Sequence, residues 1–459
     1  WRARLRMVGR LGLAAWRQPR THVAFMARVA AVVPARVNQS QVTTMPLSRL
    51  AAEYRRIEAA LLDRWDAPIV NDFLCMMAYG GSRRLLERWG GPAGVALHND
   101  VMIGQGDIIS AEPARLIRAA AVLARCLPGA EAALAAGDPA VLLALPGLGD
   151  RLRAYLERFG DRRIGELKLE QPTLDEQPAP LFAAVRAAAA SATAPPERPG
   201  PEATVNALFR GQPLRRWLAR WALNYAKARV RDRENLRFER TRIFGYARRV
   251  FQAMGRVLAA QGVLEQPDDV FFLTVPEVLG AAEGLVLTSD LKALVGLRRA
   301  EHAAAARQPE PPARVLVRGS VADPSARIAR GPAATPPIAE TGDRDPVVRS
   351  GTACGGGIAT GPVRVIRDPL TEPLASGEVL VARHTDPGWI CHFAHAAAVV
   401  VERGSVLSHS AIVSRELGIP CVVALPDACQ WLKTGEPVRV DGSRGIVRRL
   451  DPSGEPDHG

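Results

Sequence analysis

One histidine, His409, stands between two serines in the segment GSVLSHSAIVSRELG, residues 404–418. Ser408 has the side chain and position of a helix N-cap, and Gly418 those of a helix end, so this spacing predicts a helix that begins at His409. The first turn of a helix presents free N–H groups and a partial positive charge. A protonated imidazole is disfavoured there, whereas a phosphoryl group on the ring would meet backbone donors and the hydroxyls of Ser408 and Ser410. These residues permit a nucleophilic histidine, although an ordinary surface histidine at a helix start has the same local sequence.

A second group of ligand-type side chains lies at residues 384–395, in the stretch HTDPGWICHFAH. It contains His384, Cys391, His392 and His395, which are side chains that zinc accepts. The spacing matches no established zinc motif, so we expect no metal site here. Asp386 is interpreted as the cap of the following helix, with a role in orienting a partner of His409 as the alternative.

The chain divides into regions that differ in composition and in hydrophobic periodicity. Residues 1–307 show mainly helical periodicity, with apolar side chains three or four positions apart and charges between them. Residues 308–350 are rich in Pro, Ala, Gly and Arg, which predicts a flexible linker with at most a short extended pair near 313–319. Residues 351–451 predict a compact α/β domain, and 452–459 a tail. The strands expected in this domain are 361–366, 378–382, 397–402, 420–425, 437–442 and 445–450.

Within the helical region, residues 213–261 are predicted to form one long helix, with Pro213 in its first turn and Gly262 as its C-terminal cap. A stripe at helical spacing comprises Leu214, Trp217, Leu218, Trp221 and Tyr225. We interpret its tryptophans as core residues rather than as part of a cofactor site.

Three shorter segments complete the helical region. Residues 268–280 predict an extended segment followed by a helix, with Thr274 and Glu277 at capping-box spacing. The Arg-rich stretch 1–33 has the composition of a transit peptide or of a membrane-surface helix, but its periodicity continues beyond it and favours an amphipathic helix of the helical domain. Residues 187–203, rich in Ala and Pro, are expected to form a surface loop.

The composition argues against two classes of partner, nucleic acids and membranes. The 459 residues carry a formal charge of +13 but only 5% aromatic residues, and the arginines are spread along the chain. No nucleic-acid-binding signature is present, so a basic surface that attracts anionic small molecules explains the charge, and nucleic acid is not expected as a partner. No apolar run is long enough for a membrane span, and no membrane partner is expected. The six cysteines form no CxxC pair, which predicts free thiols in a reducing, cytoplasmic setting.

The window 385–425 closely resembles the mobile, phosphohistidine-bearing domain of the phosphoenolpyruvate-utilising enzymes. That family includes phosphoenolpyruvate synthase, pyruvate phosphate dikinase and rifampin phosphotransferase, and the likeness is greatest to the last type. The residues that carry it are Gly404, Ser408, His409, Ser410, Ala411 and Ile412, followed by Arg415, Glu416, Gly418 and Pro420. The segments GIATGPVRVI (357–366) and TDPGW (385–389) are similar to the family's opening strand and loop. At Ser405 and Leu407 the sequence departs from the phosphoenolpyruvate synthase pattern, which leaves open whether phosphoenolpyruvate is a phosphoryl partner.

The helical region is similar to the central domain of the same family, over residues 158–178 and 231–274. In rifampin phosphotransferases this domain holds the acceptor, and an Arg-Glu-x-x-Lys motif approaches the phosphohistidine. Arg233 and Arg237 match that motif, with arginine in place of lysine. Residues at i and i+4 share a helix face, so two guanidiniums could neutralise a transferring phosphoryl group, although a solvated charged face has the same pattern. Arg403 is a further candidate for phosphate binding, with an ion pair inside its own domain as the alternative.

The resemblance implies a multidomain fold, a mainly α-helical N-terminal domain followed by a C-terminal α/β swivelling phosphohistidine domain. His409 would carry a phosphoryl group to a small-molecule acceptor in the helical domain, with Ser408, Ser410, Arg403, Arg233 and Arg237 as phosphate ligands. No ATP-grasp domain is recognised in the sequence. Because the chain begins with Trp1, we expect the donor domain, with its Mg2+ and ATP, on a separate chain or upstream. The alternative is a non-catalytic regulatory or binding member of the family, and the acceptor's identity stays open.

Overall fold

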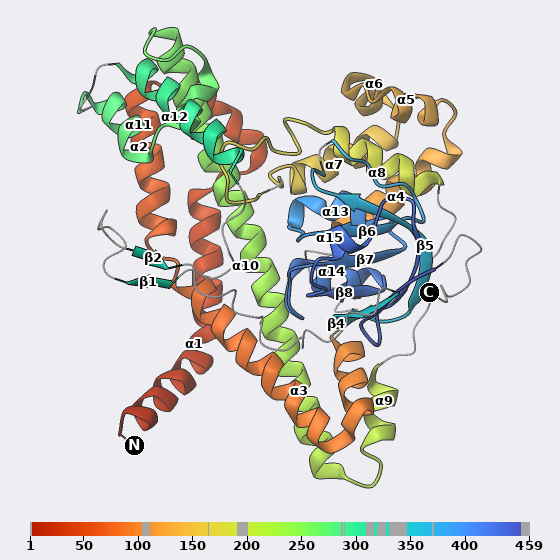
Figure 1. Cartoon of the computed structure of the whole chain (residues 1–459). Helices are drawn as coiled ribbons and strands as arrows, with labels where there is room; N and C mark the ends of the chain where they lie inside the picture. Colours follow the sequence, from red (N-terminus) through yellow and green to blue (C-terminus); the bar gives the residue numbers. More distant parts are fainter. Residues whose placement is uncertain are drawn as a thin grey trace. The chain divides into compact units, whose positions relative to one another are not determined.

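The structure is a computed structural model, which describes residues 2–102, 109, 112–163, 165–190, 201–285, 288, 290–308, 316–318, 327–329, 347–369 and 371–450 (Figure 1). The chain divides into two compact units. The first combines residues 1–254 with 347–459, and the second comprises residues 255–346. Each unit is described by itself.

The first unit begins with the helical region that its periodicity predicts. Its elements are α1 (Arg2–Val32), η1 (Arg36–Thr44), α2 (Leu47–Ile57), η2 (Glu58–Leu62), α3 (Asp66–Val101), α4 (Glu112–Cys126), α5 (Ala130–Ala136), α6 (Pro139–Ala144), α7 (Leu148–Phe159), α8 (Ala179–Ala190), α9 (Pro201–Leu208) and α10 (Pro213–Ala260). The expected amphipathic helix in 1–33 is therefore confirmed as α1. The loop expected at 187–203 is wrong at its two ends, which continue α8 and begin α9, while residues 191–200 lie outside the described part.

The long helix α10 begins at Pro213 as predicted, and Gly262, just beyond its end, has the positive φ of a C-terminal cap. Its small and branched residues pack against α3, where Cys75 and Tyr79 meet Leu223 and Ala226 in one buried cluster. The interpretation of the tryptophans on α10 as core residues was wrong.

Trp217 and Trp221 are 62% and 59% exposed, because they lie on the face of α10 opposite the small residues that contact α3. Helical spacing identified one face of the helix correctly but could not tell that the alanine-rich face was the buried one.

The C-terminal domain is an eight-stranded mixed sheet with strand order β3-β10-β9-β5-β6-β7-β8-β4. The strands are β3 (Val348–Ser350), β4 (Thr352–Gly355), β5 (Ile358–Ile366), β6 (Val379–Ala382), β7 (Ala398–Val401), β8 (Cys421–Val423), β9 (Pro437–Asp441) and β10 (Ile446–Arg449). Strands β5 to β8 pair in parallel and the outer pairs are antiparallel. The helices are η4 (Pro387–Trp389), α13 (Ile390–Phe393), α14 (His409–Leu417) and α15 (Ala428–Trp431). The expected α/β domain is thus confirmed, with a strand in each predicted segment.

The central strands are buried on both faces, as their continuous apolar sequence requires. Val379, Val381 and Val400 point into a core within the domain. Leu380 and Val399, on the other face, belong to a cluster that also contains residues of α4, α7 and α8. The helical region and the C-terminal domain therefore share a hydrophobic core in this arrangement.

The second unit contains the end of α10 from Gly255, η3 (Pro267–Phe272), α11 (Val275–Glu283), α12 (Leu291–Ala306), β1 (Leu316–Arg318) and β2 (Arg327–Ala329). The extended segment predicted before α11 is wrong, because Pro267–Phe272 forms a 3-10 helix. The predicted capping box is confirmed, with the Thr274 N–H donating to Glu277 at 2.7 Å. Arg298 binds the same carboxylate and lowers the pKa of Glu277 to about 2.

Most of the predicted linker, 308–350, and the tail, 452–459, lie outside the described residues. Val348–Ser350, within the predicted linker, pairs with β10 as strand β3, and Leu316–Arg318 pairs with Arg327–Ala329. The division of the chain at 308 and 351 otherwise stays a prediction. Across the described helices, none is both long and apolar enough to cross a membrane.

Candidate functional site

Helix α14 positions His409 as the sequence predicts. The helix starts at His409, the Ser408 hydroxyl accepts the Ala411 N–H at 3.5 Å, and Gly418 ends the helix with a φ of +72°. Ile412 and Val413 are buried beneath it. The segment before the helix turns tightly, since the Ser408 N–H donates to Ser405 O at 2.9 Å. The imidazole therefore projects from the first turn of a helix whose ends are both capped.

His409 is more deeply buried than a surface cap would be. It is only 5% exposed, and its ring meets Phe393 of α13 edge-on, with the centroids 5.7 Å apart. Neither ring nitrogen has a hydrogen-bond partner. Burial, followed by the charges of Arg162 and Arg237, lowers the pKa of His409 well below its usual value. The ring is therefore neutral at physiological pH, as expected. The main causes of the lowered pKa are burial and the two arginines rather than the helix terminus.

The two serines beside His409 have different roles. Ser408 is the N-cap, so its hydroxyl already accepts a bond from the helix. The Ser410 hydroxyl lies 2.7 Å from the Thr385 hydroxyl and is buried. In this arrangement Ser410 joins α14 to the segment that precedes η4.

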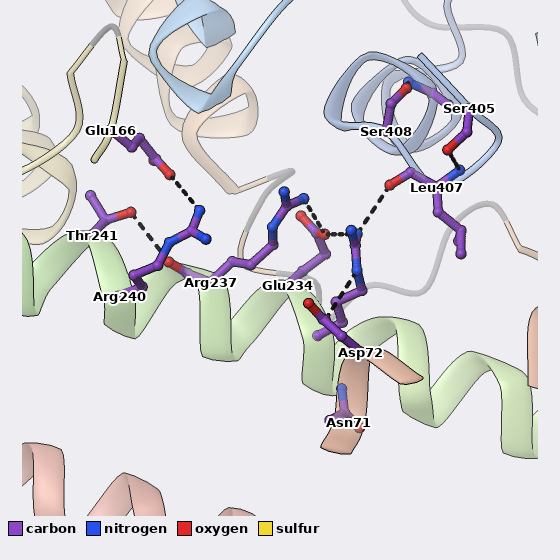
Figure 2. A network of polar contacts seen from close by, with 12 residues as sticks. Asn71, Asp72, Glu166, Glu234, Arg237, Arg240, Thr241, Ser405, Leu407 and Ser408 are labelled. Atoms are coloured by element: carbon purple, nitrogen blue, oxygen red, sulfur yellow. Dashed lines mark hydrogen bonds and ion pairs between the residues drawn. The ribbon is translucent and has the colours of Figure 1, made fainter. Parts of the chain in front are cut away.

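Arg233 and Arg237 both lie on α10, and their partners differ; Figure 2 shows Arg237 beside Glu234. Arg233 Nη1 donates to Leu407 O at 3.0 Å and lies 3.1 Å from the carboxylate of Glu234, while its Nε lies 3.2 Å from Asp72. Among the described residues, the Arg237 side chain forms an ion pair with Glu234 at 3.6 Å, and its Nη1 lacks a hydrogen-bond partner. Arg233 thus holds the loop, whereas Arg237 retains free donor capacity beside the histidine.

Arg162, just after α7, is a site residue that the sequence analysis did not single out. It is buried, its Nη1 donates to Pro387 O at 3.2 Å, and its guanidinium lies over the rings of Phe159 and Phe238 at 5.4 and 6.0 Å. Its Nε has no hydrogen-bond partner. Among charged groups, Arg162 has the largest effect on the pKa of His409. The only sequence signal was its place within the segment 158–178.

A carboxylate from each region completes the surroundings. Asp386 caps η4 through Gly388 N–H at 2.8 Å, as interpreted from the sequence, and also accepts Gly165 N–H at 2.8 Å. Glu166 is buried and lies 3.6 Å from Arg240 (Figure 2). Burial raises the pKa of both carboxyls. Asp386 therefore joins the mobile domain to the segment after α7, and Glu166 joins that segment to α10.

The other candidates lie elsewhere. Arg403 is exposed, and its backbone N–H donates to Arg383 O at 2.8 Å, so its role in phosphate binding stays a prediction. His392 and His395 direct Nε2 toward the backbone oxygens of Glu372 and Leu374, at 3.3 and 2.8 Å. Within the described ranges, no group of three or more His, Cys, Asp or Glu is arranged to hold a metal ion.

Comparison with known proteins finds a matching domain model for each region of this unit. Residues 374–445 match the model of the PEP-utilising enzyme mobile domain, and residues 69–234 match the rifampicin phosphotransferase fourth domain. The chain carries the mobile domain of the PEP-utilising enzymes. The resemblance inferred from the sequence is thereby confirmed, and the chain fits that family.

Three relatives illustrate the match. An uncharacterized protein of Mycobacterium tuberculosis is 34% identical over 337 residues, 70% of this chain and 36% of its own length. A rifampicin phosphotransferase of a Streptomyces species is 29% identical, over 66% of this chain and 34% of its own. A phosphoenolpyruvate synthase of Aeropyrum pernix is 41% identical over 116 residues, 25% of this chain and 14% of its own. The chain spans about a third of the length of the first two.

One buried arginine of the mobile domain fixes the histidine loop from behind. Arg415, on α14, donates from Nη2 to Val406 O at 2.6 Å. Its guanidinium also lies 5.9 Å from the centroid of the Tyr79 ring on α3, and Nη1 is 3.4 Å from the Tyr79 hydroxyl. Arg415 therefore connects helix α14, the histidine loop and helix α3 of the helical region.

Proposed function

We propose that this chain is the carrier and acceptor part of a phosphotransferase. His409 takes a phosphoryl group from an ATP-dependent donor domain, separate or upstream, and passes it to a small-molecule acceptor held by the helical region. The observation that carries the proposal is a neutral, unpartnered His409 at a helix N-terminus beside the free donors of Arg162 and Arg237.

The groups around His409 suit the chemistry of transfer. A neutral imidazole offers a lone pair to phosphorus, whereas a protonated ring has none to offer. In the discharge step, the acceptor oxygen bonds to phosphorus, the P–N bond breaks, and the electron pair returns to His409. The acceptor's hydroxyl proton then replaces the phosphoryl group on the ring. The charges of Arg162 and Arg237 act on His409. Their guanidiniums would offset the negative charge of the phosphoryl group during its transfer from His409 to the acceptor.

Burial of His409 implies that the two half-reactions occur in different arrangements. With 5% of the residue exposed, a donor has no access to the ring while the mobile domain rests on the helical region. Loading of His409 therefore requires the mobile domain to separate from α10, and the part of the predicted linker that precedes β3 is the proposed hinge.

The test is the intact mass of the chain after incubation with ATP and Mg2+, with and without a candidate ATP-grasp partner. We expect a gain of one phosphoryl group that is acid-labile and depends on the partner. His409→Ala removes the gain, whereas His302→Ala, at an exposed position of α12, retains it. A gain that persists in His409→Ala contradicts the assignment of the carrier. No gain with any donor favours the alternative, a non-catalytic binding member of the family.

A further inference from the structure

The exposed tryptophans of α10 belong to an apolar face on the surface of the first unit. Leu214, Trp217 and Trp221 are 69%, 62% and 59% exposed. They lie three and four residues apart, so they follow one side of the helix for about two turns. Tyr225, one turn further on, stacks on Trp221, with the ring centroids 6.0 Å apart and the ring planes at 12°. We call these four side chains the tryptophan face.

The opposite side of α10 explains why this face is exposed. Ala219, Leu223 and Ala226 are buried in the cluster that α10 forms with α3. At 3.6 residues per turn, these positions point away from Trp217 and Trp221. The packing of α10 against α3 therefore leaves the tryptophan face to solvent within the described part of the chain. A contiguous exposed apolar face of this kind marks a binding surface.

The charges around the tryptophan face are positive. Residues 203–231 contain six arginines and one lysine but no aspartate or glutamate. Arg215 and Arg220 lie on opposite flanks of the face, because the helix turns them away from it in opposite directions. Arg215 donates to the side-chain oxygen of Gln212 at 2.9 Å. Arg220 donates to that of Asn206 at 3.0 Å. Both partners are neutral amides, so the two positive charges remain available to an anionic partner.

This combination of side chains suits the interfacial region of a membrane. Tryptophan and tyrosine favour that region, because their rings are apolar while their N–H or O–H group stays hydrogen-bonded. Arginines beside an apolar stripe keep their guanidinium groups at the level of the headgroups, where anionic lipids attract them. The tryptophan face is a ridge along one helix, and a lipid surface accommodates such a ridge without a preformed groove.

We propose that the tryptophan face binds the surface of a membrane that contains anionic lipids, with Arg215 and Arg220 at the headgroups. The sequence predicts no membrane partner, because it contains no spanning segment and its tryptophans at 217 and 221 are interpreted as core residues. A helix that lies on a membrane needs no spanning segment, and both tryptophans are exposed. Membrane binding goes beyond the proposed function and does not depend on it.

The experiment is co-sedimentation of the full chain with vesicles of phosphatidylcholine alone, and of phosphatidylcholine with about 30% phosphatidylglycerol. We expect at least about 10-fold stronger binding to the anionic vesicles, and weaker binding when NaCl is raised from about 0.1 M to about 1 M. The double variant Trp217→Ala, Trp221→Ala should bind the anionic vesicles at least about 10-fold more weakly. Leu297→Ala is the control, because it removes an apolar side chain that is 58% exposed on α12, and it should bind like the unaltered chain.

A charge reversal tests the role of the arginines. Arg220→Glu should weaken binding to the anionic vesicles by at least about 10-fold, because it changes the charge at the face by two units. Arg151→Glu, at an exposed position of α7, changes the net charge equally and should change binding by less than about 2-fold.

Three results would overturn the proposal. The first is equal binding to the two kinds of vesicle, or no binding to either up to about 1 mM lipid. The second is an unchanged affinity of the double tryptophan variant for anionic vesicles. The third is self-association of the chain, without vesicle binding, that the double variant abolishes, which would assign the tryptophan face to a second copy of the chain.

Discussion

The different surroundings of Arg233 and Arg237 lead to a prediction that separates loop positioning from phosphoryl stabilisation. Arg237→Met keeps the aliphatic stem but removes the charge. The substitution removes the ion pair with Glu234 at 3.6 Å, and the Arg237 side chain is 30% exposed. Such a pair contributes about 1 kcal/mol or less to folding, so the free energy of unfolding should change little.

The effect of the same substitution on transfer should be much larger. Removing one preorganised donor from a site of developing charge costs about 10²–10³ in rate, which corresponds to about 2.7–4 kcal/mol. Arg233→Met should behave differently, because it loses bonds to Leu407 O, Asp72 and the buried Glu234. We expect it to lower the free energy of unfolding by about 2–3 kcal/mol.

The assay is quench-flow decay of phospho-His409 in the complete complex with donor and acceptor, alongside urea unfolding of each variant. Arg231→Met, at an exposed position of α10 with a 3.8 Å ion pair to Asp232, is the matched control and should discharge at the normal rate. The reasoning is refuted if Arg237→Met discharges phospho-His409 as fast as the unaltered chain. It is also refuted if that variant loses more stability than Arg233→Met.

Three further predictions concern the mobile domain. Arg415→Met should lower the free energy of unfolding by about 2–3 kcal/mol in urea titrations, because a buried charge-assisted bond to Val406 O is lost; an unchanged midpoint would show that the loop holds without it. Ser408→Ala should cost about 1 kcal/mol through loss of the N-cap on Ala411 N–H, and Ser408→Asp should restore most of it. Burial lowers the pKa of His395 to about 4. Between pH 6.5 and 4, His395 is therefore protonated in the unfolded chain but not in the folded chain. The free energy of unfolding should fall by about 3 kcal/mol as pH falls through this window. His395→Gln should reduce this pH dependence, and urea unfolding at several pH values would measure it in both chains.

Local rules predicted helix α14 almost residue by residue. Ser408, the apolar pair at 412 and 413, and Gly418 act within a few positions of one another, so their consequences are visible in the sequence. The strands of the mobile domain followed in the same way from their apolar runs and turns.

Long-range contacts were not predictable in this way. Arg162 meets Pro387 across 225 residues, and no local pattern distinguishes it from the many other arginines. The burial of His409 depends on Phe393 and on the helical region, so the sequence identified its protonation state but not the main cause. For Trp217 and Trp221 the packing partner decides which face of α10 is buried, and that partner is α3.

The ends of the C-terminal sheet have a consequence for how this module is connected to other proteins. Strands β3 and β4 lie at opposite edges of the strand order but are joined by Gly351 alone, so the two edges meet at this residue. The last strand, β10, pairs with β3, and Gly351 N–H donates to Gly445 O at 2.8 Å. The chain thus enters and leaves the sheet through neighbouring strands. Connecting segments can therefore join the sheet at this one side without breaking a strand pairing.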